Sequence, residues 1–137
     1  MNYKGYVSSR EFGGMSIPVP AQNSSLREYI SQKNGTYILP NLESSFHNCF
    51  HQLFGSLNNL NNNDMIVMYS LTMLPDGKKL DTFLDMCSLK NIGLAFVLEN
   101  ISVRDDFSII LNELESYKLS RLELNEHNWN LILKQYF

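Results

Sequence analysis

The sequence predicts a single α/β domain of three layers, with helices on both faces of a mostly parallel sheet of four or five strands. Strand-like and helix-like segments alternate along the 137 residues, which is typical of parallel sheets. Two strand segments, Met65–Ser70 and Leu94–Asn100, begin with consecutive apolar residues, a pattern typical of strands covered on both faces. The length suits one hydrophobic core, so we expect residues 1–137 to form one domain.

The first third of the chain reads as strand, loop, helix and strand. Gly5–Ser9 is a short strand, and the glycines and prolines of residues 10–20 exclude regular structure directly after it. A helix opens at Gln22, repeats apolar residues at i, i+3 and i+4, and ends at Asn34–Gly35. Thr36–Leu39 follows as the second strand.

The alternation continues through the rest of the chain. The expected elements are a helix over 46–57, a strand over Met65–Ser70, a helix over Lys78–Lys90, a strand over Leu94–Asn100 and a helix over 107–117. Residues 119–137 are interpreted as an edge strand, Leu119–Leu124, and a final helix that Asn125 caps.

Composition limits the possible partners and location. Eleven basic against fourteen acidic residues give a net charge of −3, which offers no sequence-wide attraction to nucleic acid. The N-terminus lacks the apolar run of a signal peptide, and no segment is long and apolar enough to cross a membrane. We therefore expect a cytoplasmic protein, in which Cys49 and Cys87 are free thiols.

Polar side chains gather in the segments that follow the predicted strands. Ligands of parallel sheets bind beyond the carboxyl ends of the strands, so these residues are expected to form one site. The candidates for nucleophilic or acid–base chemistry are Ser9, Glu43, His47 and Glu99, and the candidates for ligand binding are Ser8, Arg10, Gln22, Asn23, Tyr69 and Ser70.

A phosphate is the natural ligand of this set. Arg10 supplies a positive charge, and a helix N-terminus at Gln22 and Asn23 supplies free N–H groups. The alternative is structural: Ser8 and Ser9 simply close a strand, and the two amides only cap the helix.

Familiar nucleotide, hydrolase and metal motifs are absent. Gly13-Gly14 lacks the third glycine of a dinucleotide fingerprint, and neither Gly-x4-Gly-Lys nor Gly-x-Ser-x-Gly occurs. His47 and His51 have the spacing of a zinc pair, but no third ligand is evident. No metal and no cofactor are therefore expected.

Two long segments resemble the sporadic carbohydrate cluster protein family. The first joins Gly5–Gly14, Ile17–Asn23 and Leu26–Tyr29, and the second is Ile66–Pro75. The resemblance implies a context in bacterial gene clusters for surface polysaccharide, such as lipopolysaccharide O-antigen or capsule. It implies no particular reaction.

A weaker, architectural resemblance is to the catalytic domain of serine recombinases, which implies a flavodoxin-like or resolvase-like fold. Ser8 or Ser9 stands where that family has its nucleophile. Tyr6 or Val7 occupies the place of a required arginine, and Leu71–Pro75 replaces the family's Asp-Arg-x2-Arg run. Without those arginines nothing stabilises a pentacovalent phosphate, so DNA cleavage and DNA binding are not expected.

The resulting hypothesis is an accessory protein or enzyme of surface polysaccharide biosynthesis that binds a sugar phosphate or nucleotide-sugar. The alternative is a non-catalytic partner or regulatory subunit of a biosynthetic enzyme, and a degenerate recombinase-like domain ranks third. A homodimer is expected through the helix over 107–117 and the aromatic tail (Trp129, Tyr136 and Phe137), although these residues also suit packing on their own sheet.

Overall fold

The computed structural model describes residues 1–43, 46 and 48–120, and divides the chain into two compact units. The first unit is Met1–Phe107, and the second, Ser108–Phe137, is helical over 108–120. Residues 119 and 120 belong to that helix, so no strand begins at Leu119. The rest of the expected edge strand and the helix after Asn125 lie outside the described residues, and the single-domain expectation stays a prediction.

The first unit is built on a mostly parallel sheet, which confirms the predicted fold class. The strands are β1 (Asn2–Ser8), β2 (Thr36–Ile38), β3 (Leu42–Glu43), β4 (Met65–Met68), β5 (Gly93–Phe96) and β6 (Ile101–Val103). Their order is β2-β1-β4-β5-β6, and β3 also pairs with β1. Every pairing is parallel except that of β5 with β6.

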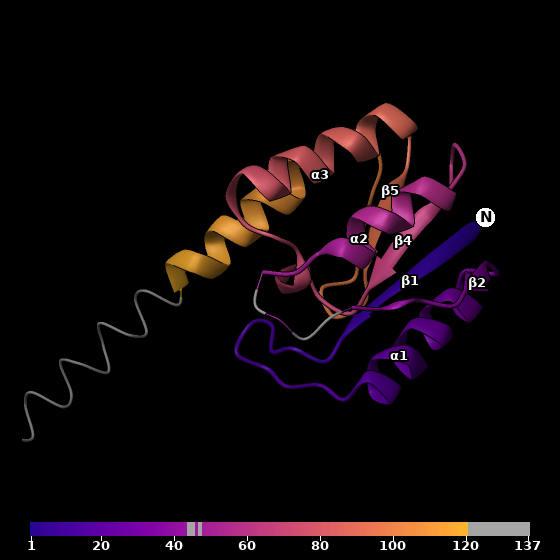
Figure 1. Ribbon diagram of the computed structural model, residues 1–137, viewed down its shortest axis with the longest axis horizontal. Helices are drawn as coiled ribbons and strands as arrows, with labels where there is room; N and C mark the ends of the chain where they lie inside the picture. The colour runs from indigo at the N-terminus through magenta and orange to yellow at the C-terminus, as the bar shows by residue number, and fades with distance from the viewer. Residues whose placement is uncertain (44–45, 47, 121–137) are drawn as a thin grey trace, which may run out of the picture. The chain divides into compact units, whose positions relative to one another are not determined.

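Helices lie on both faces of this sheet (Figure 1). Helix α1 (Val19–Gln32) covers one face, and α2 (His51–Ser56) and α3 (Gly77–Lys90) lie over the other. Short 3-10 helices follow α2 (η1, Leu57–Asn59) and β4 (η2, Leu71–Met73). Among the described residues, no helix is long and apolar enough to cross a membrane.

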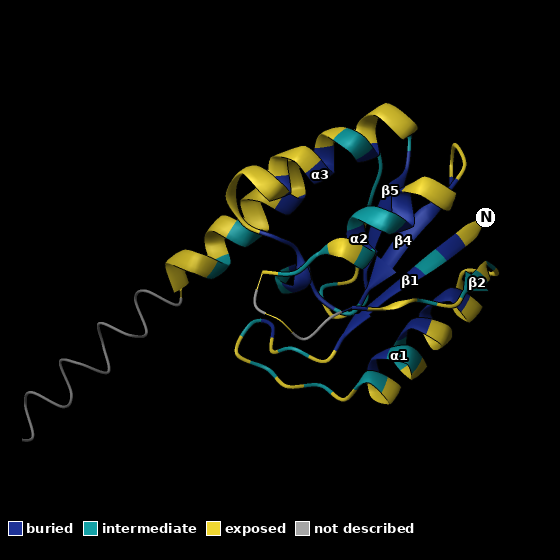
Figure 2. Cartoon of the chain, in the orientation of Figure 1, coloured by how far each residue is buried: buried dark blue, intermediate teal, exposed yellow. Residues whose placement is uncertain are grey.

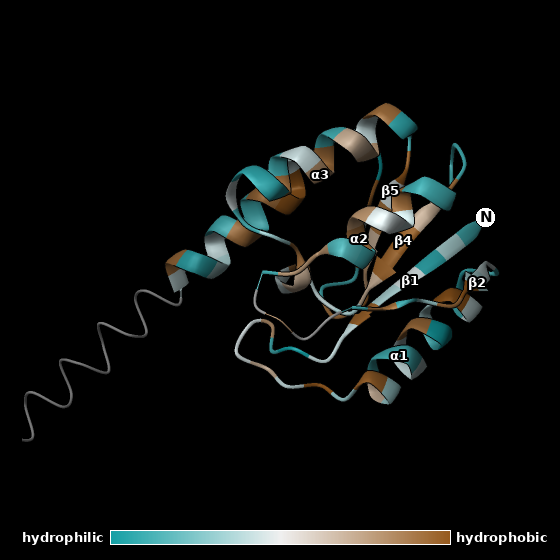
Figure 3. Cartoon of the chain, viewed as in Figure 1, coloured by the Kyte–Doolittle hydropathy of each residue, from teal (hydrophilic) through white to brown (hydrophobic). Residues whose placement is uncertain are grey.

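The apolar runs of the sequence form the centre of the sheet. Every residue of β4 and β5 is buried, as Figure 2 shows, and Figure 3 shows the same strands as hydrophobic. On the α1 side, Val7, Val67 and Ala95 pack with Leu26 and Ile30. Because strand residues alternate between faces, Tyr6 and Ser8 belong to the opposite side from Val7.

The strand expected over Leu94–Asn100 ends early and is followed by a turn and a further strand. β5 ends at Phe96, Asn100 takes a positive φ of 55°, and β6 returns antiparallel, with Phe96 opposite Ile101. β6 was not predicted because its alternating Ile-Ser-Val pattern is only three residues long. Glu99 therefore lies in this turn, beyond the carboxyl end of β5.

The second expected helix is also shorter than its apolar stripe. α2 begins at His51 rather than at residue 46. Asn48 has a φ of 63°, which an α-helix does not tolerate, and Phe46 is 78% exposed. Among the described residues that precede α2, Phe46 and Asn48 thus line the surface in front of it.

Candidate functional site

The two serines at the end of β1 differ in exposure. Ser8 is buried, and its Oγ accepts a hydrogen bond from the Arg10 main-chain N–H at 3.3 Å. Ser9 follows the strand and is exposed. Of these two residues, only Ser9 is therefore open to a ligand.

Gln22 fixes the main chain at this strand end. Its side chain is fully buried; Oε1 accepts from the Ser8 N–H at 3.3 Å, and Nε2 donates to the Ser8 carbonyl at 2.7 Å and to the Ile17 carbonyl at 2.8 Å. Asn23 accepts a hydrogen bond from the Tyr37 hydroxyl. Both amides, predicted as ligand-binding groups, thus bond to groups of the protein itself.

The partly buried side chain of Arg10 reaches the segment at the start of α2. Its Nη2 donates to the Tyr6 hydroxyl at 2.9 Å, and its Nη1 donates to the Cys49 carbonyl at 2.5 Å. The guanidinium carbon lies 4.2 Å from the centre of the Phe50 ring. The predicted phosphate-binding cation is therefore held between two hydrogen-bond acceptors and an aromatic face.

Glu43 holds the beginning of α2. Its buried carboxylate accepts from the Gln52 N–H at 3.0 Å, from the Leu53 N–H at 3.3 Å and from the Tyr6 hydroxyl at 3.1 Å. The Cys49 thiol lies 3.5 Å from its other oxygen. A negative charge on free N–H groups at a helix start is favourable, so this carboxylate stabilises the position of α2.

Tyr6 links these two charged groups and was not among the predicted site residues. Burial raises the pKa of its hydroxyl well above the ordinary 10.0, with Glu43 raising it further and Arg10 opposing the rise. The hydroxyl therefore stays protonated and can donate to Glu43 while it accepts from Arg10. The alternation of β1 places Tyr6 and Ser8 on one face, which is the signal in the sequence that would have found it.

A second carboxylate organises the ends of β4 and β5. Glu99 accepts from the Ser70 hydroxyl at 2.9 Å and from the Leu71 N–H at 2.8 Å. The Ser70 hydroxyl also accepts from the Thr72 N–H at 3.2 Å, which caps η2. The predicted acid–base candidate Glu99 and the predicted ligand-binding Ser70 are thus bonded to each other.

The loops after β1 and β4 pack together. Phe12 is buried, and its ring centre lies 6.1 Å from that of Tyr69. Gly13 and Gly14 turn with φ of 58° and 73°, and a Cβ on Gly13 would lie 2.7 Å from the Thr72 Oγ1. Glycine is required here because the chain approaches Thr72 closely in a left-handed turn.

The structure thus brings together most of the predicted site residues at one edge of the sheet, in two bonded groups. One is centred on Tyr6, Arg10 and Glu43, and the other on Ser70 and Glu99. His47 lies outside the described residues. Within the described ranges, no cluster of three or more His, Cys, Asp or Glu side chains is arranged to hold a metal ion.

An open hollow of about 550 Å³ lies in front of α2, beside the first of these groups. The residues that line it are Phe46, Asn48, Cys49, Phe50, His51, Phe54 and Lys79. The apolar members were expected in the buried stripe of a longer helix. Only the early break of that helix at Asn48 turns Phe46 outward.

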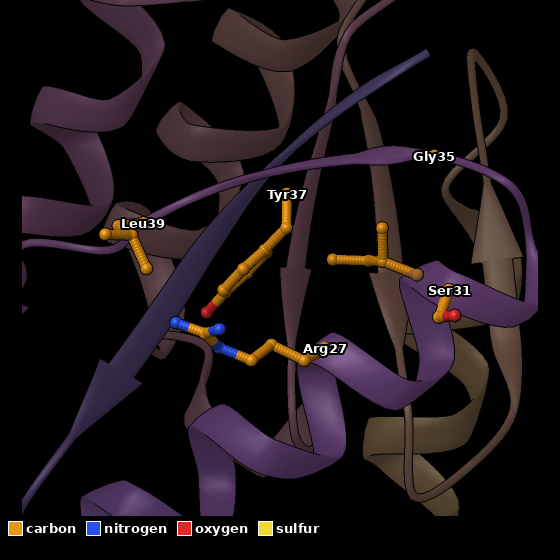
Figure 4. Close-up of a pocket in the computed structure, with 6 residues that line it drawn as sticks. Arg27, Ser31, Gly35, Tyr37 and Leu39 are labelled. Carbon is orange, nitrogen blue, oxygen red and sulfur yellow. The ribbon is translucent and has the colours of Figure 1, made fainter.

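A second hollow, of about 470 Å³, lies between α1 and β2 (Figure 4). Arg27 extends toward the Tyr37 ring, with the guanidinium carbon 5.6 Å from the ring centre. Burial raises the pKa of the Tyr37 hydroxyl, and Arg27 opposes this rise. None of the predicted site residues lines this hollow.

The fold resembles two solved structures over nearly its whole length. The N-terminal catalytic domain of TP901-1 integrase matches with a TM-score of 0.57 and 18% identity, covering 93% of this chain and 98% of that one. A resolvase family site-specific recombinase from Streptococcus pneumoniae matches with a TM-score of 0.61 and 10% identity, covering 98% and 97%. No protein-family model and no curated protein matches the chain. The likeness therefore shows a resolvase-like fold, as the weaker resemblance in the sequence implied.

These findings correct the expected function and partners. A role in surface polysaccharide or lipopolysaccharide biosynthesis is wrong, because the structural neighbours are recombinase catalytic domains and the carbohydrate cluster family finds no support. The expected partners are wrong for the same reason. They were a sugar phosphate or nucleotide-sugar ligand and a biosynthetic enzyme, with nucleic acid excluded. The exclusion relied on the net charge of −3, but a whole-chain charge does not describe the local field at one edge of a sheet.

Proposed function

We propose that this chain is a recombinase-type domain that contacts the backbone of DNA at the sheet edge where β1 and β4 end. The observation that carries the proposal is the likeness in fold to two recombinase catalytic domains across at least 93% of this chain. Site-specific recombination is a reaction of DNA, so DNA is the partner that this likeness favours. The edge is also where parallel sheets of this class bind their ligands.

The local geometry supports phosphate contact through the Ser9 hydroxyl. Ser9 is exposed directly after β1, and Gln22 holds the main chain beside it in a fixed position. Hydroxyls and main-chain N–H groups are common donors to DNA phosphates and carry no sequence information. With an acidic chain, few lysines and arginines add to the affinity, so we expect weak binding with a shallow dependence on salt.

The experiment measures fluorescence anisotropy of a labelled DNA duplex at about 50 and about 200 mM salt. We expect dissociation constants near the weak end of non-specific binding, about 10⁻⁴ to 10⁻⁵ M at the lower salt. Ser9→Asp places a negative charge at the proposed contact and weakens binding about fivefold, the equivalent of roughly 1 kcal/mol.

Ser88→Asp is the matched control. Ser88 is exposed near the end of α3, at the opposite edge of the sheet, so the same change of charge there leaves the affinity unchanged. Absence of duplex binding at 10⁻⁴ M protein, the weak end of the non-specific range, would overturn the proposal. Equal losses of DNA affinity in the two variants would contradict a contact at the sheet edge where β1 and β4 end.

Strand cleavage is a second candidate function, which the exposure of Ser9 after β1 favours. In that reaction a bond forms between Ser9 Oγ and phosphorus, the bond from phosphorus to one deoxyribose oxygen breaks, and the departing oxygen receives the hydroxyl proton. The engagement of Arg10 with Tyr6 and Cys49 argues against it, because the cation is not offered to a phosphate.

A nicked DNA substrate that traps a covalent complex separates binding from cleavage. We expect no adduct between protein and DNA by mass spectrometry. An adduct that Ser9→Ala abolishes and Ser8→Ala preserves would establish cleavage in place of simple binding.

A further inference from the structure

The hollow in front of α2 presents three phenylalanine rings. The Phe54 ring packs edge-on against the Phe83 ring, with ring centres 5.6 Å apart. The Arg10 guanidinium carbon lies 4.2 Å from the centre of the Phe50 ring. Phe46 is 78% exposed at the same hollow. Two fixed rings and one exposed ring thus face a single open space of about 550 Å³.

Two cations accompany these rings. Lys79 is exposed, its Nζ lies 5.8 Å from the centre of the Phe50 ring, and it donates to the Asn48 carbonyl at 2.8 Å. Arg10 stacks on the same ring. The neighbouring Glu43 carboxylate is buried and receives hydrogen bonds from α2 and Tyr6. Because Arg10 is held by Tyr6 and the Cys49 carbonyl, Lys79 is the cation that an anion in the hollow would meet.

We propose that this hollow binds an unpaired base of DNA by stacking on the phenylalanine rings, with Lys79 on the adjoining phosphate. The inference rests on the proposed function and names the state of DNA that the domain prefers. Aromatic stacking combined with positive charge is the common means of binding single strands without regard to sequence. The volume lies within the range of roughly 300–1,000 Å³ that small-molecule sites occupy.

The position of the hollow connects it to the end of β1. Arg10 follows Ser9 directly in the chain, and its side chain reaches the Cys49 carbonyl and the Phe50 ring that line the hollow. Through Arg10, the hollow therefore adjoins the segment that carries Ser9. The base must be unpaired, since a base within a duplex is stacked and its faces are covered.

The test compares a full duplex, the same duplex with one bulged base, and a short single strand, by fluorescence anisotropy. We expect the bulged duplex and the single strand to bind about tenfold more tightly than the full duplex, the gain typical of stacking one base. Replacing the bulged base with 2-aminopurine gives a second readout, because its fluorescence falls when it stacks.

Matched variants identify the hollow as the site. Phe46→Ala removes the gain for bulged and single-stranded DNA, whereas Leu89→Ala, at an 87% exposed position on α3, preserves it. Lys79→Glu weakens single-strand binding at least threefold more than Lys78→Glu, which makes the same change of charge at the adjacent exposed residue. All four side chains are exposed, so the variants retain the fold, which thermal unfolding verifies.

The outcomes separate the two proposals. The hollow is not the base-binding site if the bulged duplex binds no more tightly than the full duplex, or if Phe46→Ala has no effect. If full-duplex binding is still sensitive to Ser9→Asp, the proposed function stands. Absence of binding to every DNA overturns both. If single-strand binding responds equally to Lys78→Glu and Lys79→Glu, and 2-aminopurine stays bright, the hollow takes another occupant, such as an aromatic side chain of a protein.

Discussion

The side-chain amide of Gln22 holds the main chain of Ser8 from both sides, across a separation of fourteen residues. It accepts from the Ser8 N–H and donates to the Ser8 carbonyl, and no solvent reaches it. A buried amide that bonds in this way fixes both main-chain polar groups of Ser8, beside the residues of β1 that pair with β3. The position of Ser9 therefore depends on a residue of α1.

We predict that Gln22→Ala lowers the free energy of unfolding by about 3 kcal/mol, because the N–H and carbonyl of Ser8 lose their buried partner. Gln32→Ala, at the exposed end of the same helix, costs less than about 0.5 kcal/mol. Urea unfolding measures both. Similar losses in the two variants would contradict the role assigned to Gln22.

The turn at Gly13 and Gly14 offers a matched pair of substitutions. Both residues have positive φ, so alanine is strained at either position by about 1 kcal/mol. Only at Gly13 does the added Cβ also meet Thr72, at 2.7 Å from its Oγ1, whereas nothing lies within 4 Å at Gly14. We expect Gly13→Ala to cost roughly 1–2 kcal/mol more than Gly14→Ala in urea unfolding.

The companion change Thr72→Ala tests the cause of this difference. It removes Oγ1 and Cγ2, two of the three Thr72 atoms that the new methyl group would meet, and leaves the Thr72 Cβ at 3.1 Å. In its presence most of the difference between the two glycine substitutions should disappear. A persistent difference would mean that the two loops do not dock through Gly13 and Thr72.

Tyr6 makes stability fall at alkaline pH. Burial raises the pKa of its hydroxyl in the folded protein above the ordinary 10.0, so the folded state holds this proton more tightly than the unfolded state. The contribution is complete below pH 10 and is lost as the pH rises toward the folded pKa. The free energy of unfolding should fall by about 1.4 kcal/mol per pH unit above pH 10 from this group alone.

Comparison with Tyr6→Phe isolates that slope from other titrations. The variant is less stable at neutral pH, because the hydroxyl no longer joins Arg10 to Glu43, but its stability declines less steeply above pH 10. Guanidinium unfolding at a series of pH values gives both slopes. Parallel slopes would show that Tyr6 ionises as easily in the folded protein as in the unfolded chain.

The two cysteines should differ in reactivity. Cys87 is fully buried, and burial raises the pKa of its thiol to about 12, so its reactive thiolate is scarce at pH 8. Cys49 is only partly buried and lines the open hollow. We predict that iodoacetamide modifies Cys49 first and that the rate of modification of Cys87 is lower by more than about a hundredfold. Mass spectrometry of the labelled protein measures both rates.

Denaturant supplies the control for this prediction. In the unfolded chain both thiols are exposed and should react at similar rates. Rapid labelling of Cys87 in the folded protein would mean that α3 opens readily from the sheet.

Local patterns of the sequence predicted much of the fold. The apolar runs at 65–68 and 94–96 predicted two central strands, and the glycines and prolines of residues 10–20 predicted the loop after β1. Patterns failed where they were short. β6 has only three residues, and the helix breaks at the single residue Asn48. The period of apolar residues does not reveal features this short.

The candidate site was only partly predictable for a different reason. Ser8, Arg10, Glu43, Ser70 and Glu99 were expected at one edge and lie there. Their partners were not expected, because Tyr6 reaches Glu43 across 37 residues and Ser70 reaches Glu99 across 29. Such pairs depend on the order of strands in the sheet, which local patterns of the sequence do not determine.

The sequence by itself therefore determined the α/β class, the central strands and the polar character of one sheet edge, because these follow from the period and type of neighbouring residues. Only the tertiary structure decided that Ser9 faces outward while Arg10 and Glu43 anchor α2, and that Phe46 opens onto a hollow. Burial and hydrogen bonding between distant segments set these outcomes. The resolvase-like fold was implied by a resemblance in the sequence, and the likeness to two solved structures over nearly the whole chain showed it.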